Sequence, residues 1–167
     1  ICELVIRLIE GGLRVRLCGS THYSIDNVLE LLVMGDYPVE ALRIGHLDRV
    51  DRRVQSTQLD EKIDSLLEDW QQVPALAKRG DGELREMAER TAIMGADFTC
   101  GTTMGIVNHP LFRGRDKELK PWQRPIAKQP WWDVLIVDEA SKTTIQEFLV
   151  PALMARRWVI VGDVKQL

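Results

Sequence analysis

The residues best suited to chemistry are two adjacent carboxylates, Asp138 and Glu139, which directly follow the apolar run 134–137 (VLIV). This run is short, continuous and rich in β-branched side chains, which predicts a strand buried on both faces. Open parallel α/β sheets bind their ligands at the carboxyl ends of such strands. In sheets that handle phosphate, the first carboxylate can hold Mg²⁺ and the second can polarise an attacking water. The same pair also occurs at ordinary strand-to-helix turns, where the aspartate caps the next helix.

Three other loops combine glycine with small hydroxyl or polar residues at predicted strand ends: 19–22 (GSTH), 101–103 (GTT) and 162–166 (GDVKQ). Glycine lets backbone N–H groups approach an anion, and serine or threonine hydroxyls donate to phosphate oxygens without reading bases. Each loop taken alone is better described as a common turn. In a parallel sheet, however, all three open on the same edge as Asp138 and Glu139. Their shared placement favours an edge that binds phosphate groups.

The elements that would position these loops alternate between helix and strand. Strands are predicted at 14–18, 41–44, 97–100, 134–137 and 158–161. Helices are predicted at 1–10, from a cap at Ser24 or Asp26 through Leu32, at 83–94 and at 145–155. Pro151 falls inside the last helix and is expected to kink or split it. Strands separated by helices imply βαβ units and a mainly parallel sheet, so the predicted fold class is α/β.

The composition limits the possible classes of function. The net charge of −3 provides no general nucleic-acid-binding surface, so any such contact must be local. No apolar stretch approaches the roughly 20 residues needed to cross a bilayer, and no membrane partner is expected. The odd number and wide spacing of Cys2, Cys18 and Cys100 suggest reduced core thiols, and the scattered histidines do not favour a zinc site. We therefore expect a cytoplasmic protein, or a nuclear one in a eukaryote.

Four segments occur in an order that is typical of one family: 16–32 (RLCGSTHYSIDNVLELL), 98–112 (FTCGTTMGIVNHPLF), 134–141 (VLIVDEAS) and 159–167 (VIVGDVKQL). They resemble the motor core of superfamily 1 helicases, in the group that contains the nonsense-mediated decay and flap-processing helicases. The DEAS sequence followed by a hydrophobic strand and GDxxQL is the most specific part. The resemblance implies a RecA-like P-loop NTPase fold, ATP and Mg²⁺ as cofactors, and single-stranded DNA or RNA as the track.

The resemblance also implies roles for individual residues. Asp138 would coordinate Mg²⁺ through the nucleotide phosphates, and Glu139 would orient or deprotonate the attacking water. Gln166 would sense the γ-phosphate, and Asp163 would help to relay that state to the nucleic-acid groove. The residues that would contact the strand are Ser20, Thr21, His22, Asn27, Thr102 and Thr103. Asp26 would lie in the helix behind the first of these loops.

The sequence departs from the family pattern in two places. The GxxxxGK[ST] loop, whose lysine holds the β- and γ-phosphates, is absent from these residues; in the family it would precede a helix like 1–10. Lys142 stands where the family commonly has a nucleotide-binding glutamine. The chain also opens without Met, inside an amphipathic helix, and stops after a strand. We therefore expect residues 1–167 to be part of a longer parent that also holds a second RecA-like domain, and to hydrolyse ATP inefficiently alone.

Two segments have open interpretations. Residues 48–94 are mostly charged and show helical spacing, which predicts a helical insertion or stalk within the motor domain. This insertion is either a solvated helix pair or a docking surface for a partner. Residues 113–128 carry six basic against two acidic side chains, with aromatic residues interleaved. They form either a contact for single strands or a surface loop anchored by its tryptophans.

The sequence therefore predicts part of an ATP-dependent helicase or translocase, in which Mg²⁺-dependent hydrolysis drives movement along a single strand. A non-catalytic nucleic-acid-binding module derived from such a motor is the alternative, and both Lys142 and the missing phosphate loop fit it. A third possibility is a P-loop ATPase that remodels proteins. The hydroxyl loops argue against it, because a protein remodeller needs no groove that follows phosphates.

Overall fold

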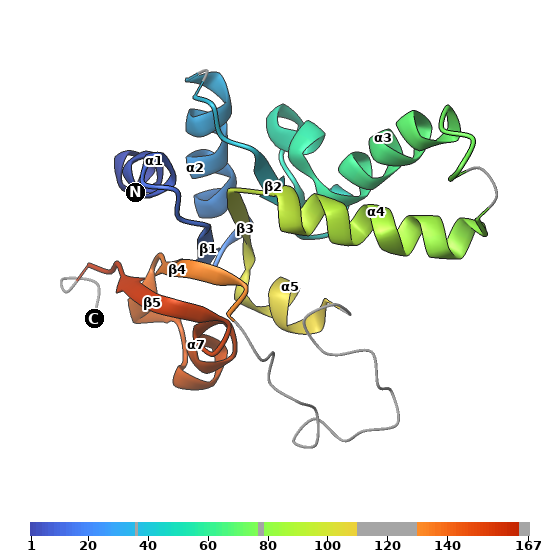
Figure 1. The fold of residues 1–167 in the computed structure, drawn as a ribbon. Coiled ribbons are helices and arrows are strands. Elements are labelled where there is room, and N and C mark those ends of the chain that lie inside the picture. The colour runs from blue at the N-terminus through green and yellow to red at the C-terminus, as the bar shows by residue number, and fades with distance from the viewer. Residues whose placement is uncertain (36, 77–78, 110–129, 164–167) are drawn as a thin grey trace.

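The computed structural model describes residues 1–35, 37–76, 79–109 and 130–163, and for residues 107 and 108 the backbone only. Its centre is a five-stranded sheet in the order β2-β3-β1-β4-β5, and every neighbouring pair of strands is parallel (Figure 1). The strands are β1 (Val15–Gly19), β2 (Ala41–Arg43), β3 (Phe98–Thr102), β4 (Trp132–Val137) and β5 (Ala155–Ile160). The predicted α/β class with a mainly parallel sheet is confirmed.

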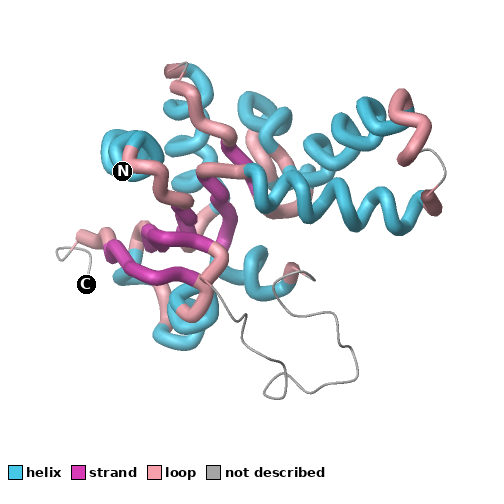
Figure 2. The backbone as a smooth tube through the Cα atoms, in the orientation of Figure 1, coloured by secondary structure: helices cyan, strands magenta, loops and turns pink. Residues whose placement is uncertain are grey.

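Helices pack on both faces of the sheet (Figure 2). The α-helices among the described residues are α1 (Cys2–Glu10), α2 (His22–Met34), α3 (Leu59–Gln71), α4 (Asp81–Gly95), α5 (Thr103–Asn108) and α7 (Ile145–Ala152). Short 3₁₀ turns cover Leu47–Arg49, Arg52–Thr57 and Ala140–Lys142. Successive strand residues face opposite sides, so Leu17 of β1 packs with α1 and α2 while Cys18 packs with α5 and α7. This double burial explains why residues 134–137 of β4 form a continuous apolar run.

The segment 48–94 holds α3 and α4, which lie side by side and project from the body of the sheet (Figure 1). Their bases form a second apolar cluster, in which Ile63 of α3 and Ile93 of α4 pack on Leu42 of β2. Arg85 of α4 adds an exposed ion pair to Asp64 of α3, with 2.9 Å between Nη1 and Oδ1. The helix pair is therefore joined to the edge of the sheet at β2.

Several boundaries differ from those that the sequence predicts. Helix α2 is capped by Thr21, whose Oγ1 accepts from Ser24 N at 3.2 Å, and neither Ser24 nor Asp26 is the cap. Thr103–Asn108 forms α5, a helix that is not among those predicted from the sequence, and Thr102 Oγ1 caps it by accepting from Gly105 N at 3.1 Å. Helix α7 contains Pro151 in its last turn and ends at Ala152, so β5 begins earlier than predicted.

Arg16 is a buried cation in the middle of β1. Its side chain is fully buried, and none of its three guanidinium nitrogens has a hydrogen-bond partner among the described residues. The guanidinium carbon lies 5.2 Å from the ring centre of Trp132, so a cation–π contact offsets part of the desolvation penalty. Burial lowers the pKa of Arg16, because removal from water disfavours the charged guanidinium.

We expect the substitution Arg16→Met to raise the free energy of unfolding by about 1–4 kcal/mol, the range found when buried ion pairs give way to apolar residues of similar volume, because it removes a buried charge and keeps much of the side-chain volume. Denaturant unfolding of the protein measures the change. The matched control is Arg14→Met, because Arg14 Nη2 donates to Ile93 O at 2.8 Å and the variant should be less stable. A destabilised Arg16→Met variant would contradict the prediction.

Candidate functional site

The acidic pair lies at the carboxyl end of β4, beside the carboxyl end of β1. Cys18 of β1 is in register with Val137 of β4, and Asp138 N donates to Cys18 O at 2.8 Å. One residue further, the side chain of Glu139 accepts a hydrogen bond from the hydroxyl of Ser20. The parallel sheet thus brings one predicted strand-contacting loop against the predicted catalytic carboxylates.

Glu139 has an unusual backbone conformation. Its φ of 51° and ψ of 42° are left-handed, and it is the one non-glycine residue with positive φ in the described part of the chain. Such a conformation costs of order 1–3 kcal/mol and clusters at functional sites. It is held by three hydrogen bonds: Glu139 N to Asp138 Oδ1 at 2.9 Å, Lys142 N to Glu139 O at 2.8 Å, and Ala140 N to Val161 O at 2.9 Å. The backbone at Glu139 is therefore firmly fixed.

Both carboxylate oxygens of Glu139 have partners. Lys142 Nζ lies 2.8 Å from Oε1, and the Ser20 hydroxyl donates to Oε2. These two hydrogen bonds, that of Lys142 first, hold the pKa of Glu139 below its usual value. Glu139 is consequently a carboxylate at neutral pH. The Lys142 side chain is 53% exposed, so solvent weakens its ion pair with Glu139.

The predicted strand-contacting residues occupy different environments. Ser20 is exposed, and Thr21 and Thr102 each use their hydroxyl oxygen as a helix cap, as described above. Asn27 is partly exposed within α2. Thr103 is only 5% exposed, so its side chain contributes to the interior more than to the surface.

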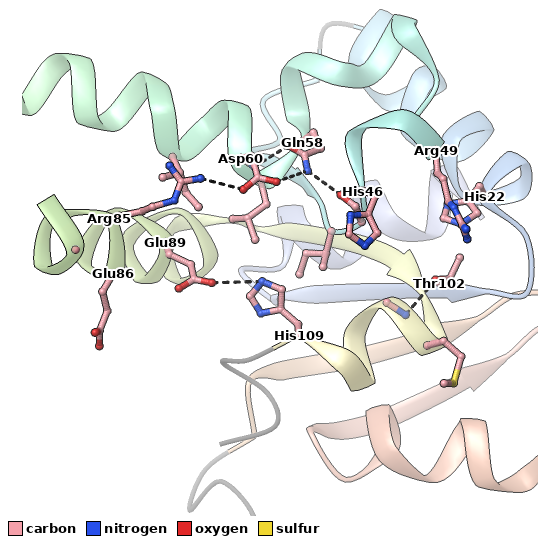
Figure 3. Close-up of a pocket in the computed structure, with 17 residues that line it drawn as sticks. His22, His46, Arg49, Gln58, Asp60, Arg85, Glu86, Glu89, Thr102 and His109 are labelled. Carbon is pink, nitrogen blue, oxygen red and sulfur yellow. Dashed lines mark hydrogen bonds and ion pairs between the residues drawn. The ribbon is translucent and has the colours of Figure 1, made fainter. Parts of the chain in front are cut away.

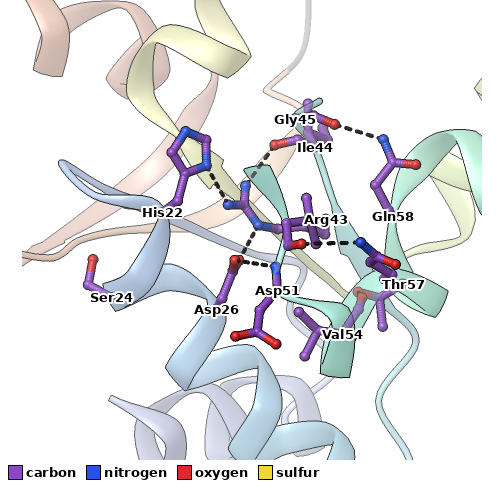
Figure 4. A network of polar contacts seen from close by, with 12 residues as sticks. His22, Ser24, Asp26, Arg43, Ile44, Gly45, Asp51, Val54, Thr57 and Gln58 are labelled. Carbon is purple, nitrogen blue, oxygen red and sulfur yellow. Dashed lines mark hydrogen bonds and ion pairs between the residues drawn. The ribbon is translucent and has the colours of Figure 1, made fainter. Parts of the chain in front are cut away.

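His22 belongs to a buried polar network that sequence reasoning identified only in part (Figure 4). Arg43 of β2 donates through Nε to Asp26 Oδ1 at 2.6 Å, and its Nη2 lies 3.0 Å from His22 Nδ1. Asp26 Oδ2 also accepts from Asp51 N at 3.0 Å. Burial and, next, the charge of Arg43 lower the pKa of His22, so the imidazole is neutral at neutral pH and Nδ1 accepts from the guanidinium.

A cavity of about 640 Å³ opens between the carboxyl ends of β2 and β3, the helices α3 and α4, and α5 (Figure 3). The predicted residues His22 and Thr102 line it. The cavity is also lined by residues that were not predicted from the sequence, among them His46, Arg49 and His109. Arg49 lies in the exposed 3₁₀ turn after β2, where a cation can meet a phosphate.

Some predicted residues lie elsewhere. Asp163 is exposed beyond the end of β5, whereas Gln166 and the basic segment 113–128 fall outside the described residues. Cys18 and Cys100 are buried free thiols, and Cys2 is partly exposed. Over the described ranges, no helix is long and apolar enough to span a membrane.

The acidic edge fits a magnesium ion that is shared with phosphate groups. Among the described side chains, no three His, Cys, Asp or Glu residues gather into a metal cage. Asp138 uses Oδ1 to accept from Glu139 N, and none of the hydrogen bonds of the described residues involves its Oδ2. One free carboxylate oxygen is what Mg²⁺ needs from a protein when most of its ligands are water and phosphate oxygens. Asp138 can therefore supply one ligand to such an ion.

Comparisons with known proteins extend these observations. A family model described as an AAA domain matches residues 122–167. The whole chain is 32% identical to the DNA replication ATP-dependent helicase/nuclease DNA2 of Homo sapiens and 30% identical to that of Bos taurus. It is 24% identical, over 195 aligned positions, to the DNA-binding protein SMUBP-2 of Rattus norvegicus. The chain spans 13% of the length of the two DNA2 proteins and 18% of SMUBP-2.

Proposed function

We propose that this chain, which is similar over its whole length to DNA2 and to SMUBP-2, forms part of an ATP-dependent motor of the superfamily 1 helicases that acts on single-stranded nucleic acid. The motor would couple Mg²⁺-dependent ATP hydrolysis to movement along one strand. The observation that carries the proposal is the contact between Ser20 and Glu139, which joins the predicted strand-contacting loop to the predicted catalytic pair. The second RecA-like domain of the parent protein would complete the nucleotide site.

Each acidic residue has a distinct role in the proposed mechanism. Asp138 would hold Mg²⁺ through Oδ2, and the ion would neutralise charge on the nucleotide phosphates. Glu139, ionised at neutral pH and fixed by its backbone, would orient the attacking water and accept its proton. Gln166 would sense the γ-phosphate, and Asp163, which lies beyond the end of β5, would help to relay that state to the nucleic-acid groove.

The strand would cross the carboxyl edge of the sheet from Ser20 and Thr21 towards His22 and Thr102 at the cavity. Asn27 and Thr103 would support these two loops. Contacts to sugar and phosphate without base readout suit a motor that must move over any sequence. The names of both kinds of relative refer to DNA, which favours DNA as the track. The compartment would be the cytoplasm or, in a eukaryote, the nucleus.

The test is ATP hydrolysis by the intact protein, measured with Mg²⁺ in the presence and absence of single-stranded DNA. We expect hydrolysis that the strand stimulates. Strand binding without hydrolysis would support the alternative, a non-catalytic binding module. The ion pair between Lys142 and Glu139 favours that alternative, because it engages the carboxylate that is proposed to act as the general base. Hydrolysis that no single strand affects would contradict the motor and the binding module alike.

Arg49 offers a test of the proposed strand path. If Arg49 neutralises one phosphate, Arg49→Ala should weaken binding of labelled single-stranded DNA and reduce the slope of log K against log salt by about 0.7. Fluorescence titrations between low and moderate salt measure this slope. The control is Arg52→Ala, because Arg52 is an exposed arginine three residues away that does not line the cavity. Equal slopes for the unsubstituted protein and for Arg49→Ala would show that the strand does not contact Arg49.

A further inference from the structure

Ser20 and Glu139 meet because two adjacent strands end at the same level. Cys18 and Val137 are paired across β1 and β4, and each of the two residues lies two positions beyond that pair. The two positions are 119 residues apart in the sequence. The fixed backbone of Glu139 keeps its carboxylate at this junction, so a change of partner requires only the side chains to move.

The hydroxyl of Ser20 differs from those of Thr21 and Thr102. The two threonines use their oxygens to cap α2 and α5, so their orientation is set by the local fold. Ser20 caps no helix: its proton goes to Glu139 Oε2, and the residue is exposed to solvent. A hydroxyl has one proton and donates to one acceptor at a time. A phosphate oxygen of a bound strand would therefore compete with Glu139 for this donor.

We propose that Ser20 is a positioning residue that couples strand binding to Glu139. Without a strand, Ser20 and Lys142 together occupy both oxygens of Glu139. When a strand binds, the Ser20 hydroxyl turns to its sugar–phosphate backbone and Oε2 becomes free to face water. This inference rests on the proposed function, because it assumes that the strand passes Ser20. If strand binding weakens the contact between Ser20 and Glu139 by some factor, linkage requires that loss of this contact strengthens strand binding by the same factor.

Strand binding in the absence of nucleotide tests the coupling. We expect Glu139→Ala in the intact protein to tighten binding of labelled single-stranded DNA by about fivefold or more, a usual coupling between linked sites. In a protein that also carries Ser20→Ala, the same Glu139→Ala change should give only the small gain expected from losing one negative charge. Glu139→Gln measures that gain, because it removes the same negative charge and keeps a side-chain oxygen that can still accept from Ser20.

The double-mutant cycle separates a shared donor from simple charge repulsion. Equal tightening by Glu139→Ala with and without Ser20→Ala would overturn the proposal while leaving the strand path intact. Absence of any strand binding would overturn the proposal and the proposed function together.

Hydrolysis provides a second readout. We expect Ser20→Ala to raise ATP hydrolysis without a strand and to reduce the stimulation by a strand, whereas Ser20→Thr, which keeps a hydroxyl, should restore the parent behaviour. A Ser20→Ala variant with unchanged stimulation would also contradict the coupling. Because the binding cycle needs no nucleotide, a failure of the ATPase proposal leaves it interpretable.

Discussion

Replacing Glu139 by glutamine in the intact protein is expected to lower the rate of ATP hydrolysis by roughly 10²–10⁴-fold, the usual contribution of a general base, while nucleotide binding is retained. The amide has nearly the same shape as the carboxylate and can still accept from Ser20 or Lys142, so the left-handed turn should persist. It cannot accept a proton from water. Steady-state hydrolysis and a titration with nucleotide, both with Mg²⁺, measure the two properties separately.

The matched control is Glu147→Gln. Glu147 is a carboxylate close in sequence, but it forms the capping box of α7 with Thr144, and glutamine serves equally well in that position. Its hydrolysis rate should equal that of the parent protein. If Glu139→Gln hydrolysed ATP at the parent rate, the assignment of the base would be wrong, and the bridge to Lys142 would then be an ordinary ion pair at a turn.

The central sheet could be predicted because the residue types within its strands indicate buried strands without knowledge of their neighbours. The run 134–137 is apolar on both faces, and the structure buries it between two helical layers. The start of α5 could not be placed in the same way, because Thr102 reads equally well as a strand end, a turn or a cap. The early start of β5 follows from how Pro151 ends α7, which is a property of the packed chain.

The candidate site was predictable where a motif supplies the residues, as for Asp138, Glu139 and Ser20. What the sequence does not contain is the register between β1 and β4, which decides that Ser20 meets Glu139. Arg43 was missed for a related reason. An arginine at the end of a three-residue strand looks like a surface residue until α2 places Asp26 against it.

Substitution of Asp26 by alanine is expected to lower the free energy of unfolding by about 3–5 kcal/mol, because it leaves Arg43 buried without an anion. The side chains of Arg43 and Asp26 are 0% and 8% exposed, so water cannot replace the lost partner. Denaturant unfolding measures the loss. Asp64→Ala is the control: its carboxylate also pairs with an arginine, but it is 63% exposed and should matter far less.

A double variant separates the structural role of this ion pair from its effect on the strand site. Changing Asp26→Leu together with Arg43→Met removes both charges, so most of the lost stability should return. The contact from Arg43 to His22 Nδ1 is absent from the double variant, so His22 is no longer held at the cavity. We therefore expect weak strand binding in a stable protein. If the double variant recovered both its stability and its strand binding, Arg43 would act on the fold alone. If the single and double variants were equally unstable, the loss of stability would not come from leaving Arg43 buried without an anion.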